Sequence, residues 1–287
     1  GLIGTATSAA LRAAGHKLTI LTRRGRPATD NVTYVTAFGA CTEPIDAVIN
    51  LAGAGLADRR WSGDYKREIV SSRVDLTRDL VAWLGGLEHT PTRLISASAI
   101  GYYGAADEQT LAEDGALGAG FAATLCKSWE NEAVTATGYG TQVTLLRFGV
   151  VLAREGGALE KMTQSFRLGV ESWLGSGEQW LSWIHLSDAV RVIQHVLDYD
   201  RPADIYNAVA HKPARHRELA HEVGRQYNTW LTLGVPAFAA RLMAGEMAQE
   251  LLLSGQRVAP AQLLEDGFQF QYPNLKEALA DLMSSTA

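Results

Sequence analysis

Short apolar runs alternate with amphipathic segments along the first half of the chain. The runs at 18–21, 47–53, 93–98 and 142–151 are typical of buried strands. Between them, the segments 71–84 and 121–134 carry apolar residues at helical spacing. This alternation predicts an α/β fold of Rossmann type, in which a doubly wound parallel sheet is covered by helices on both faces.

The pattern changes near residue 150. Glycine-rich pieces appear at 155–157 and 175–177, together with a cluster of tryptophans at Trp173, Trp180 and Trp183. Helical patterns follow at 187–197, 215–227, 236–243 and 275–283. We expect a Rossmann domain over 1–150 and a smaller, mixed, mainly substrate-side lobe over 151–287, with some segments returning to the Rossmann core.

The first residues of the chain predict that a strand precedes them. Gly1 to Gly4 open an amphipathic run that ends at Gly15, and the strand 18–21 follows. A helix that begins at the first residue lacks the central strand that precedes it in a doubly wound sheet. We therefore expect this strand, about ten residues with its turn, to lie upstream of Gly1.

Composition excludes several classes of protein. The chain has 287 residues, of which 47% are hydrophobic and 20% charged, and a net charge of −5, which argues against a general nucleic-acid surface. Cys41 and Cys126 form no CxxC pair, and His211, His216 and His221 do not share one helix face, so neither a disulfide framework nor a metal site is predicted. No apolar stretch is long enough to span a bilayer, and no signal-peptide pattern is present. We expect a protein of the cytoplasm or of an organelle matrix or stroma, with a small-molecule substrate; an oligomer is left open.

Two motifs near the start of the chain predict a dinucleotide-binding site. Gly1-x-x-Gly4 at the start of a helix presents backbone N–H groups to a pyrophosphate. The strand 18–21 then ends in Thr22-Arg23-Arg24, whose hydroxyl and guanidinium groups suit a 2′-phosphate. An NAD, FAD or SAM site is expected to carry an acidic residue there. The sequence therefore favours NADP(H), while a solvated basic loop is the structural alternative.

Small residues end two further strands. Asn50-Leu51-Ala52-Gly53 permits close approach to the adenosine half of a cofactor, and Ser96-Ala97-Ser98-Ala99 places a hydroxyl where a substrate oxygen can accept a hydrogen bond. Strand-terminating turns explain the same residues without function. Arg147 is expected to be a buried ion-pair partner, and His185 to fix a loop or cap the next helix.

These motifs together resemble the atypical, epimerase-like branch of the short-chain dehydrogenases/reductases, which includes nucleoside-diphosphate-sugar epimerases and SulA-like proteins. The likeness covers almost the whole chain. Beyond the segments above it is carried by Arg60-Trp61, Ser72-Arg73, Ile100-Gly101-Tyr102-Tyr103-Gly104, Trp129-Glu130, 147–152, 166–169, 175–177, 183–188, 255–258 and Gly267-Phe268.

The resemblance implies a set of residues around NADP. Glu68 and Arg73 belong to it only through the resemblance, since from their own pattern they are a charged pair on a helix. The whole cofactor set is Gly1, Leu2, Ile3, Gly4, Thr22, Arg23, Arg24, Leu51, Ala52, Gly53, Glu68, Arg73, Ser96, Ala97 and Val150.

The sequence departs from the family at the catalytic pair. Ordinary members carry Tyr-x-x-x-Lys on the helix after the serine strand, where the tyrosine passes a proton to the substrate oxygen. Alignment on Glu130 puts Ala122 and Cys126 at these two positions, with Lys127 one residue too late. The Tyr-x-x-x-Lys at Tyr272 to Lys276 is interrupted by proline and is interpreted as a chance match. The catalytic candidates that remain are Ser98, Tyr102, Tyr103 and Lys127.

Two functions are open at this point. One is an NADP(H)-dependent oxidoreductase or epimerase-like enzyme that acts on an unknown substrate, with nucleotide sugars among the candidates. The other is a non-catalytic NADP(H)-binding sensor or scaffold. The absent Tyr/Lys pair favours the second, and the motifs retained in the substrate lobe favour the first.

Overall fold

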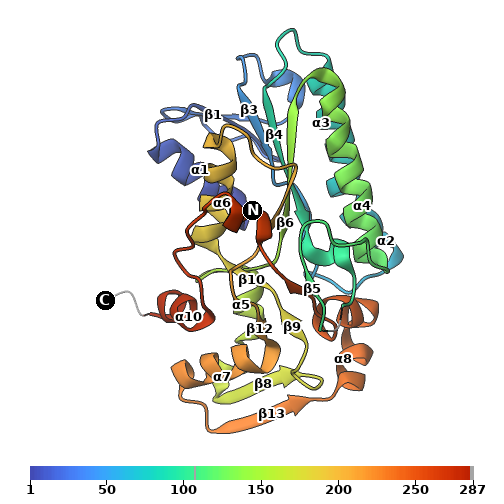
Figure 1. The fold of residues 1–287 in the computed structure, drawn as a ribbon, viewed down its shortest axis with the longest axis vertical. Coiled ribbons are helices and arrows are strands. Elements are labelled where there is room, and N and C mark those ends of the chain that lie inside the picture. Colours follow the sequence, from blue (N-terminus) through green and yellow to red (C-terminus); the bar gives the residue numbers. More distant parts are fainter. Residues whose placement is uncertain (107, 285–287) are drawn as a thin grey trace.

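The computed structural model describes residues 1–106 and 108–284 as an α/β fold with a smaller lobe below it (Figure 1). The strands are β1 (Leu18–Leu21), β2 (Val32–Val35), β3 (Ala47–Asn50), β4 (Arg93–Ala99), β5 (Thr110–Leu111), β6 (Gln142–Phe148), β7 (Val150–Leu152), β8 (Val170–Leu174), β9 (Trp180–Leu181), β10 (Trp183–His185), β11 (Ile205–Ala208), β12 (Ala214–Arg215), β13 (Leu231–Val235) and β14 (Arg257–Val258). The α-helices are α1 (Leu2–Ala13), α2 (Gly63–Val70), α3 (Leu76–Gly85), α4 (Phe121–Val134), α5 (Gly157–Met162), α6 (Leu186–Asp198), α7 (His216–Tyr227), α8 (Ala237–Ala244), α9 (Ala261–Glu265) and α10 (Leu275–Met283).

Four parallel strands form the central sheet, in the order β11-β6-β4-β3. β1 and β2 pair in parallel as a separate two-stranded sheet. Helices α3 and α4 cover one face of the central sheet, and α1 and α6 lie on the other (Figure 1). An α/β fold around a parallel sheet is thus confirmed, while the strand expected upstream of Gly1 stays a prediction.

Two predicted elements have different limits in the structure. The expected strand 142–151 is divided into β6 and β7, and β7 pairs with β10. The division falls at Gly149, where a Cβ would lie only 2.5 Å from the carbonyl oxygen of Ser182. The helix expected at 71–84 begins earlier, because the Ser62 hydroxyl accepts a hydrogen bond from Tyr65 N (3.1 Å) and caps α2; the π-helical turn η2 (Ser71–Asp75) then joins α2 to α3.

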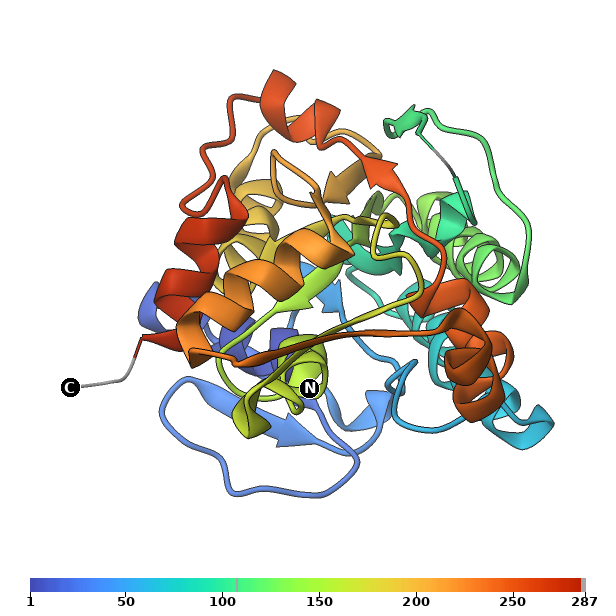
Figure 2. The ribbon, with the colours of Figure 1, turned by 90° about the horizontal axis from the view of Figure 1, so that it is seen from below.

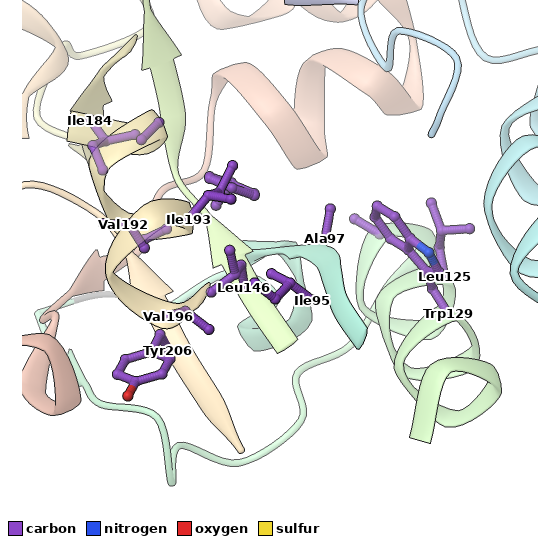
Figure 3. Close-up of a cluster of buried hydrophobic side chains, with 14 of the residues drawn as sticks. Ile95, Ala97, Leu125, Trp129, Leu146, Ile184, Val192, Ile193, Val196 and Tyr206 are labelled. Atoms are coloured by element: carbon purple, nitrogen blue, oxygen red, sulfur yellow. The ribbon is translucent and has the colours of Figure 1, made fainter. Parts of the chain in front are cut away.

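The two faces of the sheet differ in chemistry. Toward α6, Ile95 and Leu146 belong to an apolar cluster with Val192, Ile193 and Val196 (Figure 3). The opposite face is apolar only in its amino-terminal half, where Leu94, Val143 and Leu145 join a cluster with residues of α3 and α4. In its carboxyl-terminal half it carries Ser96, Ser98 and Arg147, all buried. Because ligands bind at the carboxyl ends of parallel strands, this polar half marks the candidate site.

The lobe has its own core. β8 pairs in parallel with β13, α7 packs on β8, and α10 packs on α7 (Figure 2). From the second half of the chain, α6 and β11 belong to the central sheet and its covering helices. The domain boundary near residue 150 stays a prediction.

The segment after α8 is fastened to the amino end of α4. The Glu250 carboxylate, on the π-helical turn η6 (Ala248–Leu252), accepts hydrogen bonds from Phe121 N (2.9 Å) and Ala122 N (2.8 Å). A Cβ at Gly120 (φ +107°) would lie 2.8 Å from this carboxylate. Glu250 therefore supplies the cap that α4 lacks in its own sequence.

We expect Glu250→Ala to lower the free energy of unfolding by about 1–2 kcal/mol, because two backbone N–H groups at the positive helix end lose their acceptor. Urea denaturation followed by tryptophan fluorescence measures the change. Glu155→Ala, which removes an exposed carboxylate without a hydrogen bond among the described residues, is the matched control. Equal stability of the two variants would contradict the capping role.

Candidate functional site

The amino end of α1 lies beside the end of β3. α1 has no side-chain cap and no acidic residue in its first turn, so its first N–H groups face no carboxylate of their own helix. A Cβ at Gly4 would lie 4.0 Å from Leu51 Cδ1. Gly4 is thereby placed next to the first residue beyond β3, and Gly1, Leu2 and Ile3 precede it at the amino end of α1. This arrangement can accept a pyrophosphate.

The end of β1 presents two arginines to solvent. The Thr22 hydroxyl accepts a hydrogen bond from Arg24 N (3.1 Å) and donates one to Arg24 O (2.6 Å). Thr22 is therefore half-buried in the turn, while Arg23 and Arg24 are exposed. Among the described residues, neither arginine forms an ion pair. Two free guanidinium groups beyond a parallel strand suit a phosphate ester.

The ends of β3 and β4 are braced by buried polar side chains. Asn50 donates hydrogen bonds to the hydroxyls of Thr77 (2.9 Å) and Ser96 (3.3 Å), and accepts one from Ala52 N (3.3 Å). Ser96 is fully buried and Ala97 lies on the opposite face of β4. Of the predicted cofactor residues, Ser96 therefore acts on the backbone shape of the site, and Val150 is half-buried at the start of β7.

Arg73 reaches the turn after β3, whereas Glu68 does not. The Arg73 guanidinium donates to Ala54 O (2.8 Å), and a Cβ at Gly53 would lie 2.9 Å from its Cζ atom. Arg73 is 8% exposed, and burial lowers the pKa of its guanidinium. Glu68 is exposed and pairs with Arg59 (3.3 Å). A side chain at position 53 would therefore shift the Arg73 guanidinium from its place against the turn.

Arg147 is the centre of a buried network. Arg147 lies on β6, directly beside Ser98 on β4 and Asn207 on β11. Its guanidinium donates to both carboxylate oxygens of Glu130, on α4, at 2.8 Å and 2.9 Å. Arg147 is 2% exposed and Glu130 5%, so the pair is shielded from water. The pair confirms the ion-pair role expected for Arg147; its partner was not predicted.

Two of the catalytic candidates are held inside this network. The Ser98 hydroxyl donates to Glu130 (2.6 Å). The Tyr103 hydroxyl donates to Asn207 Oδ1 (2.7 Å) and accepts from Arg147 (2.9 Å). Burial raises the pKa of the Tyr103 phenol, and this outweighs the opposite effect of Arg147. Both hydroxyls therefore brace the ends of the strands.

Tyr102 is placed differently. It is half-buried, and the Arg147 guanidinium carbon lies 3.6 Å from its ring centroid. Its hydroxyl makes no hydrogen bond within the described part of the chain. Lys127 is exposed on α4, one residue past the buried Cys126, and so faces solvent instead of the network. Of the four catalytic candidates, the geometry leaves Tyr102 available for a substrate.

The 3₁₀ turn η3 (Ile100–Tyr103) covers the two α4 positions of the absent pair. A Cβ at Gly101 would lie 3.2 Å from Ala122 Cβ and 3.7 Å from Cys126 Sγ. A tyrosine at position 122 would collide with this turn. Burial raises the pKa of the Cys126 thiol to about 11, and the charge of Glu130 adds to the effect, so the thiol is neutral near pH 7.

Sequence reasoning found His185 but missed most of the network. His185 caps α6 by accepting a hydrogen bond from Ser187 N (3.0 Å), as expected. Glu113 was not predicted as part of the network. Its carboxylate accepts hydrogen bonds from Asn207 N (2.9 Å) and Gln262 N (3.3 Å) and so joins β11 to the start of α9. Trp129-Glu130, recognised as a motif, was the available signal for the partner of Arg147.

No group of three metal-ligating side chains is found among residues 1–106 and 108–284. No described helix is long and apolar enough to cross a membrane.

Comparison with known proteins identifies the family of the chain. Residues 1–208 match the model of the NAD-dependent epimerase/dehydratase family. The chain belongs to this family. Residues 235–282 match a domain of unknown function, DUF1731, which contains Glu250. The first match therefore covers the central sheet and the residues of the Arg147 network, and the second covers the segment that caps α4.

Relatives of this epimerase/dehydratase family member share nearly its full length. An epimerase family protein of Mycobacterium bovis is 38% identical, over 97% of this chain and 93% of its own length. The chloroplastic SDR39U1 homolog of Arabidopsis thaliana is 36% identical, with 99% and 84% covered. The crystal structure of human SDR39U1 with NADPH has a TM-score of 0.89 at 29% identity, with 99% and 96% covered. The nucleoside-diphosphate sugar epimerase from Corynebacterium glutamicum has a TM-score of 0.78 at 27% identity, with 99% and 56% covered.

We expect Glu130→Gln to lower the free energy of unfolding by about 3–5 kcal/mol, because it leaves the Arg147 charge buried without a carboxylate. Glu132→Gln on the same helix is the control, since Glu132 pairs with the half-exposed Arg78 and is expected to cost under about 1 kcal/mol. Urea denaturation measures both. A loss for Glu130→Gln no larger than that of the control would show that the buried pair does not hold the fold.

Proposed function

We propose that this family member is an NADP(H)-dependent oxidoreductase or epimerase-like enzyme, with nucleotide-linked sugars as the first candidate substrates. The observation that carries the cofactor choice is the pair of exposed arginines beyond β1, held by the Thr22 turn. A second support comes from human SDR39U1, whose crystal structure contains NADPH. Cofactor binding of this kind places the pyrophosphate at the amino end of α1.

The chain's own residues fit the rest of the cofactor. We expect Ala52 and Gly53, beyond the end of β3, to lie beside the cofactor, and Arg73 fixes the turn that carries them. Bound NADP(H) supplies or accepts a hydride at its nicotinamide. Residues of the chain must then orient the substrate and move one proton on its oxygen. Site residues supplied by the resemblance, Glu68 among them, stay predictions.

Tyr102 is the residue that we propose for this proton. Its phenol donates to the substrate oxygen as a ketone is reduced, and takes the proton back as an alcohol is oxidised. Arg147 beneath its ring holds it in place and is itself fixed by Glu130. An epimerase would oxidise and then reduce its substrate while it retains the cofactor, whereas a reductase would only reduce it and then release the cofactor.

A second candidate function is a non-catalytic NADP(H) sensor or scaffold. The observation in its favour is that Ser98 and Tyr103 have their hydroxyls engaged in the Arg147 network, and that Lys127 is exposed. The same fold would then bind cofactor without passing a proton. Both functions require that the protein binds NADPH, but only the enzyme turns over a substrate.

We expect NADPH to bind at least tenfold more tightly than NADH, and Arg23→Ala/Arg24→Ala to remove this preference, since each lost charge-assisted hydrogen bond to a phosphate contributes about 1.5–3 kcal/mol. Calorimetric titration of both nucleotides measures it. Arg26→Ala, in the same loop but placed over the Tyr34 ring, is the control. Equal affinity of both nucleotides for the unaltered protein would overturn the NADP assignment.

We expect Tyr102→Phe to leave NADPH affinity unchanged and to lower turnover about 10²- to 10⁴-fold, because the proton donor is lost. The probes are UDP-glucose and UDP-glucuronate with NADP⁺, followed by NADPH absorbance and by chromatography of the sugar nucleotides. Tyr139→Phe, an exposed tyrosine beyond α4, is the control. Tight NADPH binding without turnover of either probe would favour the sensor, and full activity of Tyr102→Phe would exclude Tyr102 as the donor.

A further inference from the structure

β13 forms the outer edge of the lobe. It pairs in parallel with β8, in a sheet that contains these two strands alone among the described residues. Figure 1 shows β13 at the lower end of the molecule, on the side of β8 that points away from the central sheet. One edge of β13 therefore has no neighbouring strand in the described part of the chain.

Half of the β13 backbone is directed to this open edge. Val235 O accepts a hydrogen bond from Gly175 N (2.8 Å), as part of the pairing with β8. Because backbone direction alternates along a strand, Thr232 and Gly234 direct their N–H and C=O groups to the opposite edge. No described residue bonds to these groups. They are thus available to another strand.

The side chains along this edge are apolar and exposed. Leu231 and Leu233 lie on one face of β13, and both are exposed. Trp230, just before the strand, is 78% exposed, and Phe238, on α8 just after it, is 71% exposed. The stretch 226–240 contains no charged residue. Edge strands are usually protected from pairing by charges or prolines, and β13 carries neither.

We propose that β13 pairs antiparallel with β13 of a second copy of this chain and forms a two-fold symmetric dimer through the lobe. In an antiparallel pair, opposite residues whose backbone groups point across the pair exchange two hydrogen bonds. Thr232 then lies opposite Gly234 of the partner subunit, and Leu233 lies opposite Leu233 of the partner subunit at the two-fold axis. This register gives a partner to every outward N–H and C=O group of Thr232 and Gly234, and the two lobe sheets become one.

A second copy fits this edge because the strand is complementary to itself. Leu231 lies opposite Val235 of the partner subunit, so apolar side chains meet apolar ones across the pair. No like charges meet, since the stretch around β13 is uncharged. Trp230 of the partner subunit lies opposite Pro236, which directly precedes α8. The partner's Trp230 is thereby brought to the exposed ring of Phe238.

The exposed apolar surface sets the expected strength of the dimer. The two leucines and two aromatic side chains at this edge present roughly 500 Å² in each copy. A standard interface buries about 800 Å² of each partner. The dimer is therefore reversible, with a Kd on the order of micromolar. Because β13 lies at the end of the lobe away from the central sheet, the dimer is independent of the proposed function (Figure 1).

Sedimentation velocity of the whole chain over a wide range of concentration tests the dimer. We expect a monomer–dimer equilibrium for the unaltered protein, and a dimer at least about tenfold weaker for Leu233→Lys, because two like charges then face each other at the axis. Leu233 is exposed in a single copy, so the circular dichroism spectrum is expected to stay unchanged. Val134→Lys, at an exposed position of α4, is the matched control and is expected to dimerise like the unaltered protein.

Disulfide cross-linking tests the register without a change of charge. Residues directly opposite each other in a non-hydrogen-bonded antiparallel pair have Cα atoms about 4.5 Å apart, within reach of a disulfide. We expect Leu233→Cys to give a covalent dimer with oxidised glutathione, detected on a non-reducing gel. Leu231→Cys, on the same face of the same strand, is expected to give none, since its counterpart in the partner subunit lies about 14 Å away.

Three results would overturn the proposal. A monomer at every concentration would show that the edge stays open. A dimer that Val134→Lys weakens and Leu233→Lys does not would place the interface at α4. Equal cross-linking of the two cysteine variants would exclude the two-fold pairing of β13.

Discussion

Burial of the Arg147 guanidinium at the carboxyl end of β6 constrains everything around it. A charged group out of water is tolerated only when an opposite charge and acceptors surround it. Glu130 supplies the charge from α4, and Tyr103 and Glu113 O supply acceptors from η3 and the loop beyond. Ser98 and Asn207 then complete the hydrogen bonds of Glu130 and Tyr103. One buried pair thereby sets the relative positions of β4, β6, β11, α4 and η3.

The network also fixes η3, through Tyr103, over the two α4 positions at which alignment on Glu130 would put a Tyr-x-x-x-Lys pair. The space over Ala122 and Cys126 is taken by Gly101, so η3 lies where a helix-borne tyrosine would extend. The same turn carries Tyr102, with its ring on Arg147. Glu250, from the DUF1731 segment, fixes the helix end next to it.

Local pattern was enough to predict β1, β3, β4 and β6, the covering helices and the turns beyond β1 and β3, because each depends on residues a few positions apart. It did not predict β2, or β11 in the central sheet. It failed where contacts join distant segments. Nothing in the neighbourhood of Glu250 indicates that it caps a helix 129 residues away. Glu68 is exposed and paired with Arg59, and its place at the cofactor, expected through the resemblance, stays a prediction. Successive residues of a helix point about 100° apart. Cys126 is therefore buried while Lys127, the next residue, is exposed.

The most direct test of the account is a crystal structure of the chain with NADP⁺ bound. We expect the 2′-phosphate within hydrogen-bond distance of Arg23 or Arg24, the pyrophosphate at the amino end of α1, and the nicotinamide beside Tyr102. A 2′-phosphate directed away from both arginines, or a nicotinamide remote from Tyr102, would contradict it.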